Sequence, residues 1–176
     1  MRISNLLFSA ALLCLCVLVA MGDETPKSAH TNIVNGEGAK IGTAKITPAP
    51  GGVKIAIDVE KLPPGEHGIH IHNVGKCETP GFTSAGGHFN PTNAHHGTNN
   101  PQDPHPHLGD LPNLVVNKEG KAKTTFTARD VTLGNGANSL FHDGGTALVI
   151  HANADDLKSD PSGNSGDRIA CGAIEK

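Results

Sequence analysis

The residues from 53 to 60 alternate strictly between branched apolar and other side chains. The apolar positions are Val53, Ile55, Ile57 and Val59. A period of two puts these side chains on one face of an extended chain and predicts a β-strand with one face buried. Segments rich in Pro and Gly, at 50–52 and 63–65, bound the strand with turns.

Seven further short segments have the character of strands and are separated by turn signals. They are residues 30–34, 41–47, 114–117, 121–128, 131–133, 146–151 and 169–174. The 22 Gly and 12 Pro residues suit frequent turns and exclude a bundle of long helices. The sequence therefore predicts an all-β domain, an antiparallel sandwich or barrel of about eight strands.

The size and charge of the chain exclude some classes of function. The 176 residues fit one domain with a short appendage. A net charge of -3 has the wrong sign for binding nucleic acid through phosphate contacts. The absence of Trp and Tyr leaves few aromatic rings for stacking bases. We therefore expect no nucleic-acid partner, and the 11 histidines direct attention to metal ions instead.

The first 22 residues form a separate unit. Arg2 precedes an apolar run at 6–20 that is followed by small residues. This layout predicts a secretory signal peptide over residues 1–22, with an uncleaved membrane anchor as the alternative. Residues 23–176 would then be the mature domain. It would be exported to a periplasm or the extracellular space, with no stable membrane span after the signal is removed.

Two cysteines, Cys77 and Cys171, remain after the first 22 residues. An even pair in an exported chain is expected to form one disulfide, because such compartments are oxidising. Two buried free thiols are the alternative.

Two long segments, 73–112 and 152–167, interrupt the strands. Both are rich in Gly, Pro, Asn and Asp. Loops of this length inside a compact domain are usually functional or disordered. The first segment holds five of the histidines, which favours a function.

Several histidines occur in patterns suited to metal ligands. On a strand, His70 and His72 would lie on one face, about 6.5–7 Å apart, and could bind one ion. His151 ends an apolar run and would bring a ligand on a rigid strand. Each pattern alone is weak, because an exposed strand can carry histidines by chance. The first long segment adds three imidazoles and a carboxylate, a set typical of zinc. This set is drawn from His88, His95-His96, His107 and Asp110.

Six sequence blocks, taken in order, resemble the copper/zinc superoxide dismutases. They are GEHGIHIH, SAGGHFNP, HHG, HLGDLPN, GTALVIHANADD and GNSGDRIACGAI, and they extend over essentially the whole chain after residue 22. The resemblance implies an eight-stranded Greek-key sandwich or flattened barrel with two long functional loops. It also implies an enzyme that dismutates superoxide to molecular oxygen and hydrogen peroxide with copper and zinc, as antioxidant defence outside the cytosol.

The resemblance further implies roles for single residues. Copper would be bound by His70, His72, His88 and His151, and zinc by His88, His96, His107 and Asp110. His88 would therefore bridge the two metals and take part in catalysis. The other implied roles are Asp155 as a carboxylate linking the two ligand sets, Arg168 as the catalytic residue that attracts superoxide, Cys77 and Cys171 as the disulfide, and His67 as a packing residue.

Four histidines have no role in this scheme. The family pattern places the ligand directly before glycine, which favours His96 over His95. The sequence LGD after His107 likewise favours that residue over His105. His30 and His142 match no family residue and are expected at the surface.

Two other function classes compete with an active dismutase. A non-enzymatic relative that binds metal for storage or delivery would be favoured if a copper ligand or Arg168 were missing. A zinc hydrolase would need an open zinc position beside a general base. The implied ligands and Arg168 are all present and the zinc set is full, so the sequence favours the dismutase. Superoxide would be its substrate, and the choice between monomer and homodimer stays open.

Overall fold

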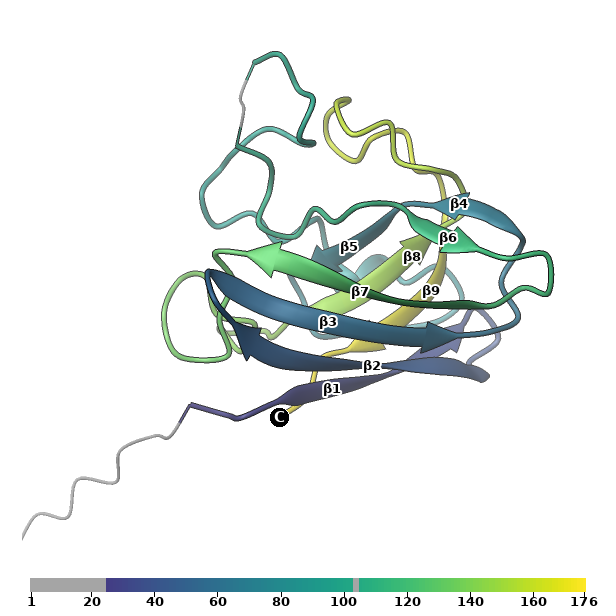
Figure 1. Cartoon of the computed structure of the whole chain (residues 1–176), viewed down its shortest axis with the longest axis horizontal. Coiled ribbons are helices and arrows are strands. Elements are labelled where there is room, and N and C mark those ends of the chain that lie inside the picture. Colours follow the sequence, from purple (N-terminus) through teal and green to yellow (C-terminus); the bar gives the residue numbers. More distant parts are fainter. Residues whose placement is uncertain (1–24, 103–104) are drawn as a thin grey trace, which may run out of the picture.

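The computed structural model describes residues 25–102 and 105–176, which fold into a curled antiparallel β-structure (Figure 1). Within these residues seven strands form one sheet in the order β5-β8-β9-β1-β2-β3-β7, and β4 pairs with β6 separately. The strands are β1 (Ala29–Asn35), β2 (Lys40–Ala49), β3 (Gly52–Val59), β4 (Gly65–His67), β5 (Ile69–His72), β6 (Leu114–Val116), β7 (Ala122–Arg129), β8 (Ala147–His151) and β9 (Arg168–Ala173). All of these strand pairs are antiparallel, so the predicted all-β class is confirmed.

The sheet curls so that its two halves face each other. Figure 1 shows β1, β2, β3 and β7 in one layer, with β5, β8 and β9 behind them. The alternation along β3 buries the predicted apolar face and exposes the other. One core joins the two layers, and it includes Ile55 and Ile57 of β3, Ile69 and Ile71 of β5, and Leu148 and Ile150 of β8.

Strands β5 and β8 are buried on both faces. Ile69 and Ile71 point into the shared core, so the alternating His70 and His72 point to the opposite face. There the long loops cover them. A smaller apolar cluster supports this face, and it comprises Phe82, Ala85, Ala147, Val149 and Cys171. The histidines of β5 are therefore held between a sheet and a cover of loops, away from bulk water.

The strand list differs from the prediction at two places. Residues 131–133 form no strand, and the chain there makes a single bridge between Thr132 and Ser139. That bridge is parallel, and the Gly- and Asn-rich segment between its ends is far too short for the crossover that a parallel ladder needs. Conversely, residues 65–67 form β4, which pairs with β6 although the sequence predicted a turn at 63–65 and no strand directly after it. With β5 included, the described part of the chain has nine strands.

No helix in residues 25–102 and 105–176 is long and apolar enough to cross a membrane. Their one helical element is the short 3-10 turn η1 (Thr83–Ala85). The predicted signal peptide, residues 1–22, lies outside the described residues.

Candidate metal centre

Two groups of ligand atoms meet on the covered face of β5 and β8. The copper set, as we name it after the prediction, contains His70, His72, His88 and His151. The zinc set contains His88, His96, His107 and Asp110. Within each set the ligand atoms lie within 4.8 Å of one another, and His88 belongs to both. The structure thus brings every predicted ligand into one centre.

The first long loop runs back along β5 and so carries two ligands to it. His88 forms a bridge with His72, and Asp110 forms one with His70. The backbone of Gly109 lies against that of Ile71, whose N–H donates to the Gly109 carbonyl at 2.8 Å. A Cβ at Gly109 would overlap the Ile71 carbonyl oxygen, so this close approach requires glycine.

In the copper set, two rings are oriented by backbone carbonyls. His72 Nδ1 donates to Gly86 O at 2.9 Å, and His151 Nδ1 donates to Gly166 O at 3.1 Å. Each ring therefore keeps an unprotonated Nε2, and these two atoms lie 3.4 Å apart. Two lone pairs that face each other at this distance favour a shared cation between them.

The other two copper-set rings have a buried nitrogen without any hydrogen-bond partner. These atoms are Nδ1 of His70 and Nε2 of His88. Orphaned buried polar atoms are rare because they cost free energy, and an ion is one of the few things that explain them. Four convergent imidazole nitrogens also suit copper in either oxidation state. The residues present therefore fit the group that the prediction assigned to them.

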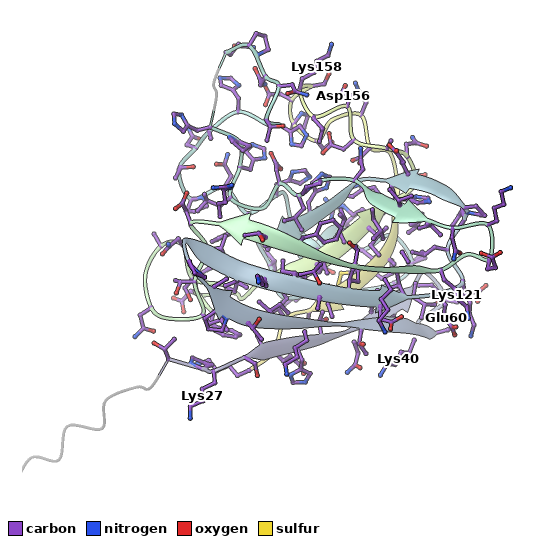
Figure 2. The ribbon with its side chains drawn as sticks, in the orientation of Figure 1. Lys27, Lys40, Glu60, Lys121, Asp156 and Lys158 are labelled. Atoms are coloured by element: carbon purple, nitrogen blue, oxygen red, sulfur yellow. A yellow bond between two sulfur atoms is a disulfide. The ribbon has the colours of Figure 1, made fainter. Side chains whose placement is uncertain are left out.

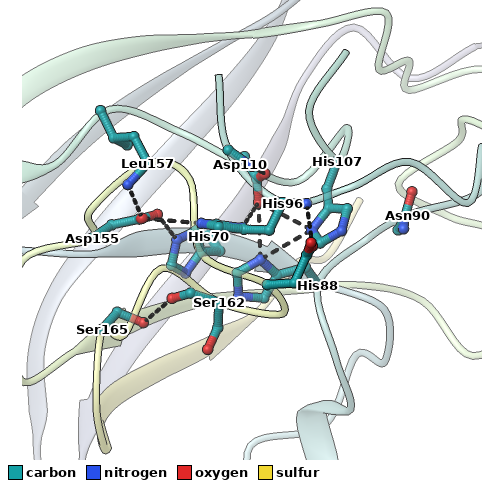
Figure 3. A network of polar contacts seen from close by, with 12 residues as sticks. His70, His88, Asn90, His96, His107, Asp110, Asp155, Leu157, Ser162 and Ser165 are labelled. Atoms are coloured by element: carbon teal, nitrogen blue, oxygen red, sulfur yellow. Dashed lines mark hydrogen bonds and ion pairs between the residues drawn. The ribbon is translucent and has the colours of Figure 1, made fainter. Parts of the chain in front are cut away.

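In the zinc set, three rings converge on one carboxylate oxygen (Figure 3). Asp110 Oδ1 lies 2.9 Å from His88 Nδ1, 3.1 Å from His96 Nδ1 and 3.3 Å from His107 Nδ1. Three imidazoles and one carboxylate make a closed tetrahedral zinc set. This set fits zinc and leaves no ligand position for a substrate.

Asp155 connects the two sets from behind (Figure 3). Its Oδ2 accepts a hydrogen bond from His70 Nε2 at 2.7 Å, and its Oδ1 accepts one from His96 Nε2 at 3.0 Å. The carboxylate is buried, with 4% of the residue exposed. Such a partner fixes the orientation of a metal-binding ring and makes it a better ligand. Asp155 thus forms a hydrogen-bonded link between a ring of the copper set and a ring of the zinc set.

Arg168, at the start of β9, stands beside the copper set. Its guanidinium donates to Phe82 O at 2.7 Å and to Gly86 O at 2.6 Å. With His72, His88, His151 and others it lines a cavity of about 410 Å³. The disulfide Cys77–Cys171 ties the same loop to β9. The predicted disulfide is therefore confirmed, and a cation faces the cavity that leads to the histidines.

Comparison with known proteins bears on this centre. Residues 40–174 match the family model described as copper/zinc superoxide dismutase (SODC). The chain belongs to the copper/zinc superoxide dismutase family. Membership confirms the resemblance seen in the sequence. It also establishes the chain as a superoxide dismutase, an oxidoreductase, with copper and zinc as its cofactors.

Individual relatives agree with the family. Superoxide dismutase (Cu-Zn) 1 of Aquifex aeolicus (strain VF5) is 49% identical over 148 residues, which cover 83% of this chain and 86% of the relative. The superoxide dismutase-like protein YojM of Bacillus subtilis (strain 168) is 44% identical over 148 residues, covering 82% and 74%. A solved structure of the Cu/Zn superoxide dismutase from Brucella abortus has a TM-score of 0.68 at 33% identity, covering 84% of this chain and 99% of that one.

Burial keeps the copper set of this superoxide dismutase neutral. Desolvation lowers the pKa of His70 to about 3, of His72 to about 2 and of His151 to about 4 in the metal-free protein. It also lowers the pKa of His88. A neutral imidazole offers the lone pair that a metal needs, so these rings are ready to bind at neutral pH.

The zinc set has the opposite electrostatics in the metal-free protein. Burial disfavours a charged His96, but its hydrogen bonds to Asp110 and Asp155 outweigh this and raise the pKa to about 9. Burial likewise disfavours ionised Asp110, yet the hydrogen bonds from His107, His88 and His96 hold its pKa well below the usual range. At neutral pH the metal-free zinc set therefore holds a protonated His96 beside an ionised Asp110, and His96 must release a proton when it binds a metal.

The remaining histidines lie outside both sets. His67 is buried, with Nδ1 2.8 Å from His151 O and Nε2 2.8 Å from Pro63 O. His30 and His105 are exposed. His142 was expected at the surface, but it is half-buried and stacks on Phe89 at 5.3 Å between ring centroids. That correction follows from the loop after β7, which folds back onto the core.

Proposed function

We propose that this chain dismutates superoxide to molecular oxygen and hydrogen peroxide with the ligand assignments given above. Copper would be held by His70, His72, His88 and His151, and zinc by His88, His96, His107 and Asp110. The observation that carries the proposal is the position of one ring. His88 turns Nδ1 to the zinc set and a buried, unpartnered Nε2 to the copper set.

Copper supplies one-electron redox chemistry when bound, and zinc, which has none, supplies only charge and geometry. The chain's own residues do the rest. Arg168 offers a fixed positive charge to a small anion in the cavity of about 410 Å³. His88, which lines that cavity, can hold a proton on Nε2 and deliver it to the product. Its Nδ1 stays fixed by the zinc set, so the ring does not drift when Nε2 is free.

The rival classes explain fewer of these features. A protein that only stores or delivers metal needs no arginine at the cavity, yet Arg168 is held there by two short hydrogen bonds. This rival deserves weight, because a relative with 44% identity bears the name superoxide dismutase-like. A zinc hydrolase needs an open ligand position, which a set of three imidazoles and a carboxylate does not offer.

We also propose that residues 1–22 are a signal peptide and that residues 23–176 work in a periplasm or the extracellular space. The support is the apolar run behind Arg2 and the disulfide Cys77–Cys171, a bond typical of oxidising compartments. Mass spectrometry of the chain from the exported fraction would give a new N-terminus near residue 23. An intact N-terminus in a cell-bound protein would contradict export by cleavage.

The activity is tested on residues 23–176 loaded with copper and zinc. Superoxide consumption is followed for the parent, for His151→Ala and for His30→Ala. His151 belongs to the copper set alone and His30 is exposed at a distance, so the second variant is the matched control. We expect fast consumption by the parent and the control, and a loss of at least about 100-fold in His151→Ala. A parent no faster than free copper would refute the proposal.

A further inference from the structure

The two long loops are joined to each other outside the metal centre. Asp160 Oδ1 accepts a hydrogen bond from the backbone N–H of His96 at 2.7 Å. Its Oδ2 accepts from His95 Nδ1 at 2.8 Å and from Asn100 Nδ2 at 3.2 Å. Asn100 also donates to the carbonyls of His96, at 3.0 Å, and of Lys158, at 2.9 Å. One carboxylate and one amide thus fix the backbone on both sides of a zinc-set residue.

The backbones of the two loops also touch directly. The N–H of Asn99 donates to Leu157 O at 2.8 Å. Gly97 lies so close that a Cβ there would overlap the same carbonyl group, and its φ of +87° is also one that glycine adopts readily. The contact is therefore a specific junction that depends on these residues.

The junction adjoins the wall of the cavity that Arg168 and the copper set line. Asp160 is followed by Pro161 and Ser162, and both line the cavity together with His88 and Arg168. A displacement of Asp160 would therefore move a zinc-set backbone on one side and the cavity wall on the other. In the described residues Asp160 is the acidic side chain that accepts a hydrogen bond from the backbone N–H of His96.

We propose that Asp160 is a positioning residue, which holds His96 in place for zinc and couples it to the wall formed by Pro161 and Ser162. The inference rests on the proposed function, because it takes the His96 set as the zinc ligands. Asp160 acts through the backbone of its neighbours and touches neither metal nor substrate. Sequence reasoning did not find it, since no pattern marks a side chain that bonds to a backbone N–H 64 residues away.

The charge of Asp160 supports this role. The carboxyl of an aspartate is ordinarily ionised at neutral pH, and this one accepts from both the His96 N–H and His95. A hydrogen bond to an ionised acceptor is stronger than one between neutral groups. The bond to His96 therefore persists although the Asp160 side chain is 39% exposed.

Asp156 provides a matched control in the same loop. It is exposed and accepts hydrogen bonds from Lys158 N, Ser159 N and Asn164 Nδ2. These partners all lie in its own loop. Figure 2 shows Asp156 and Lys158 at the outer end of that loop. Loss of Asp156 removes a similar charge and similar local bonds but no hydrogen bond between the two loops.

The test measures release of zinc from the zinc-loaded protein to a chromogenic chelator, together with the visible absorption of Co(II) bound in place of zinc. We expect Asp160→Ala to release zinc about tenfold faster than the parent and to alter the Co(II) spectrum. Asp160→Asn keeps an oxygen that can accept from the His96 N–H, so it should restore most of the parental rate. Asp156→Ala should match the parent.

Equal release from Asp160→Ala and Asp156→Ala would overturn the proposal, and so would an Asp160→Asn variant as fast as Asp160→Ala. Should Asp160→Ala fail to fold, zinc release is measured for Asn100→Ala and Asp160→Asn instead. Asn100→Ala removes the amide between His96 and Lys158. A parental rate of zinc release from this variant would contradict the proposed role of the junction. A parent that binds neither zinc nor Co(II) would instead refute the ligand assignment of the proposed function.

Discussion

His88 Nδ1 lies 2.9 Å from Oδ1 of Asp110, while Nε2 of the same ring is buried with no partner. The ring therefore has one nitrogen in each ligand set, and its side chain is only 3% exposed. Deprotonation of both nitrogens is costly unless a cation holds each of them. Two bound metals would stabilise this arrangement, and the family to which the chain belongs is one of copper/zinc enzymes.

The carboxylate of Asp155 should control zinc affinity. It accepts hydrogen bonds from His70 and His96 at once, and an amide has only one oxygen to offer them. We expect Asp155→Asn to weaken zinc binding about 10- to 100-fold, as measured by competition with a chelator. Asp156→Asn, the exposed neighbour, should bind as the parent does. Equal affinities for the two variants would show that the link is dispensable.

Arg168 should govern capture of the substrate. Removal of its guanidinium leaves the ligand sets intact but takes the positive charge from the cavity. For Arg168→Ala we expect kcat/KM to fall about tenfold and to lose much of its dependence on ionic strength, with both metals retained. Arg129→Ala, an exposed arginine at the end of β7, serves as the control. Unchanged steady-state kinetics in Arg168→Ala would contradict the role.

The metal-free protein should be most stable at about pH 6.5. The unfolded chain has histidine pKa values near 6.5, whereas burial lowers those of His70, His72 and His151 to about 3, 2 and 4. Between pH 6.5 and about 4 the unfolded state binds more protons, so the free energy of unfolding falls as the pH falls. Each proton by which the two states differ changes the free energy of unfolding by about 1.4 kcal/mol per pH unit.

Above pH 6.5 the slope of the free energy of unfolding against pH changes sign, because the pKa of His96 is raised to about 9. Between pH 6.5 and 9 the folded state holds more protons, so stability is lost as the pH rises. Urea unfolding of the metal-free protein at a series of pH values tests both limbs. In His151→Ala the acid limb should be shallower than in the parent. A flat profile from pH 4 to 9 would be incompatible with these shifts.

The disulfide should stabilise the fold and hold the arginine. It closes a loop with a sequence separation of 94, for which chain entropy gives roughly 4–5 kcal/mol. We expect the double variant Cys77→Ala and Cys171→Ala to lose stability of this order in urea unfolding. Its activity should also fall, because Phe82 O and Gly86 O, which orient Arg168, lie in the tethered loop. Full activity in the double variant would show that the disulfide is not needed to orient Arg168.

Much of the fold could be predicted because the signals are local. The alternation in β3 and the apolar run of β8 extend over whole strands, and the structure has strands there. Residues 131–133 misled the prediction, since a short apolar run does not reveal how soon the chain turns back. β4 was missed because its three residues pair with β6, a partner far along the chain.

The ligand sets could be predicted only through the resemblance of six blocks. Spacing alone left His95 and His96 as alternatives, and the structure puts His96 in the zinc set and His95 beside Asp160. Contacts such as those of Asp160 depend on how two loops meet, and no local pattern encodes that. His142 was misplaced for the same reason, since its stacking on Phe89 is a long-range contact.

The most direct test of the central claim is the metal content per chain of residues 23–176, measured after reconstitution with copper and zinc. The shared position of His88 predicts one copper and one zinc in each chain. It further predicts that His88→Ala weakens the binding of both metals, because both sets lose a ligand. A chain that takes up zinc but refuses copper would contradict the account, as would a His88→Ala variant that binds both metals as the parent does.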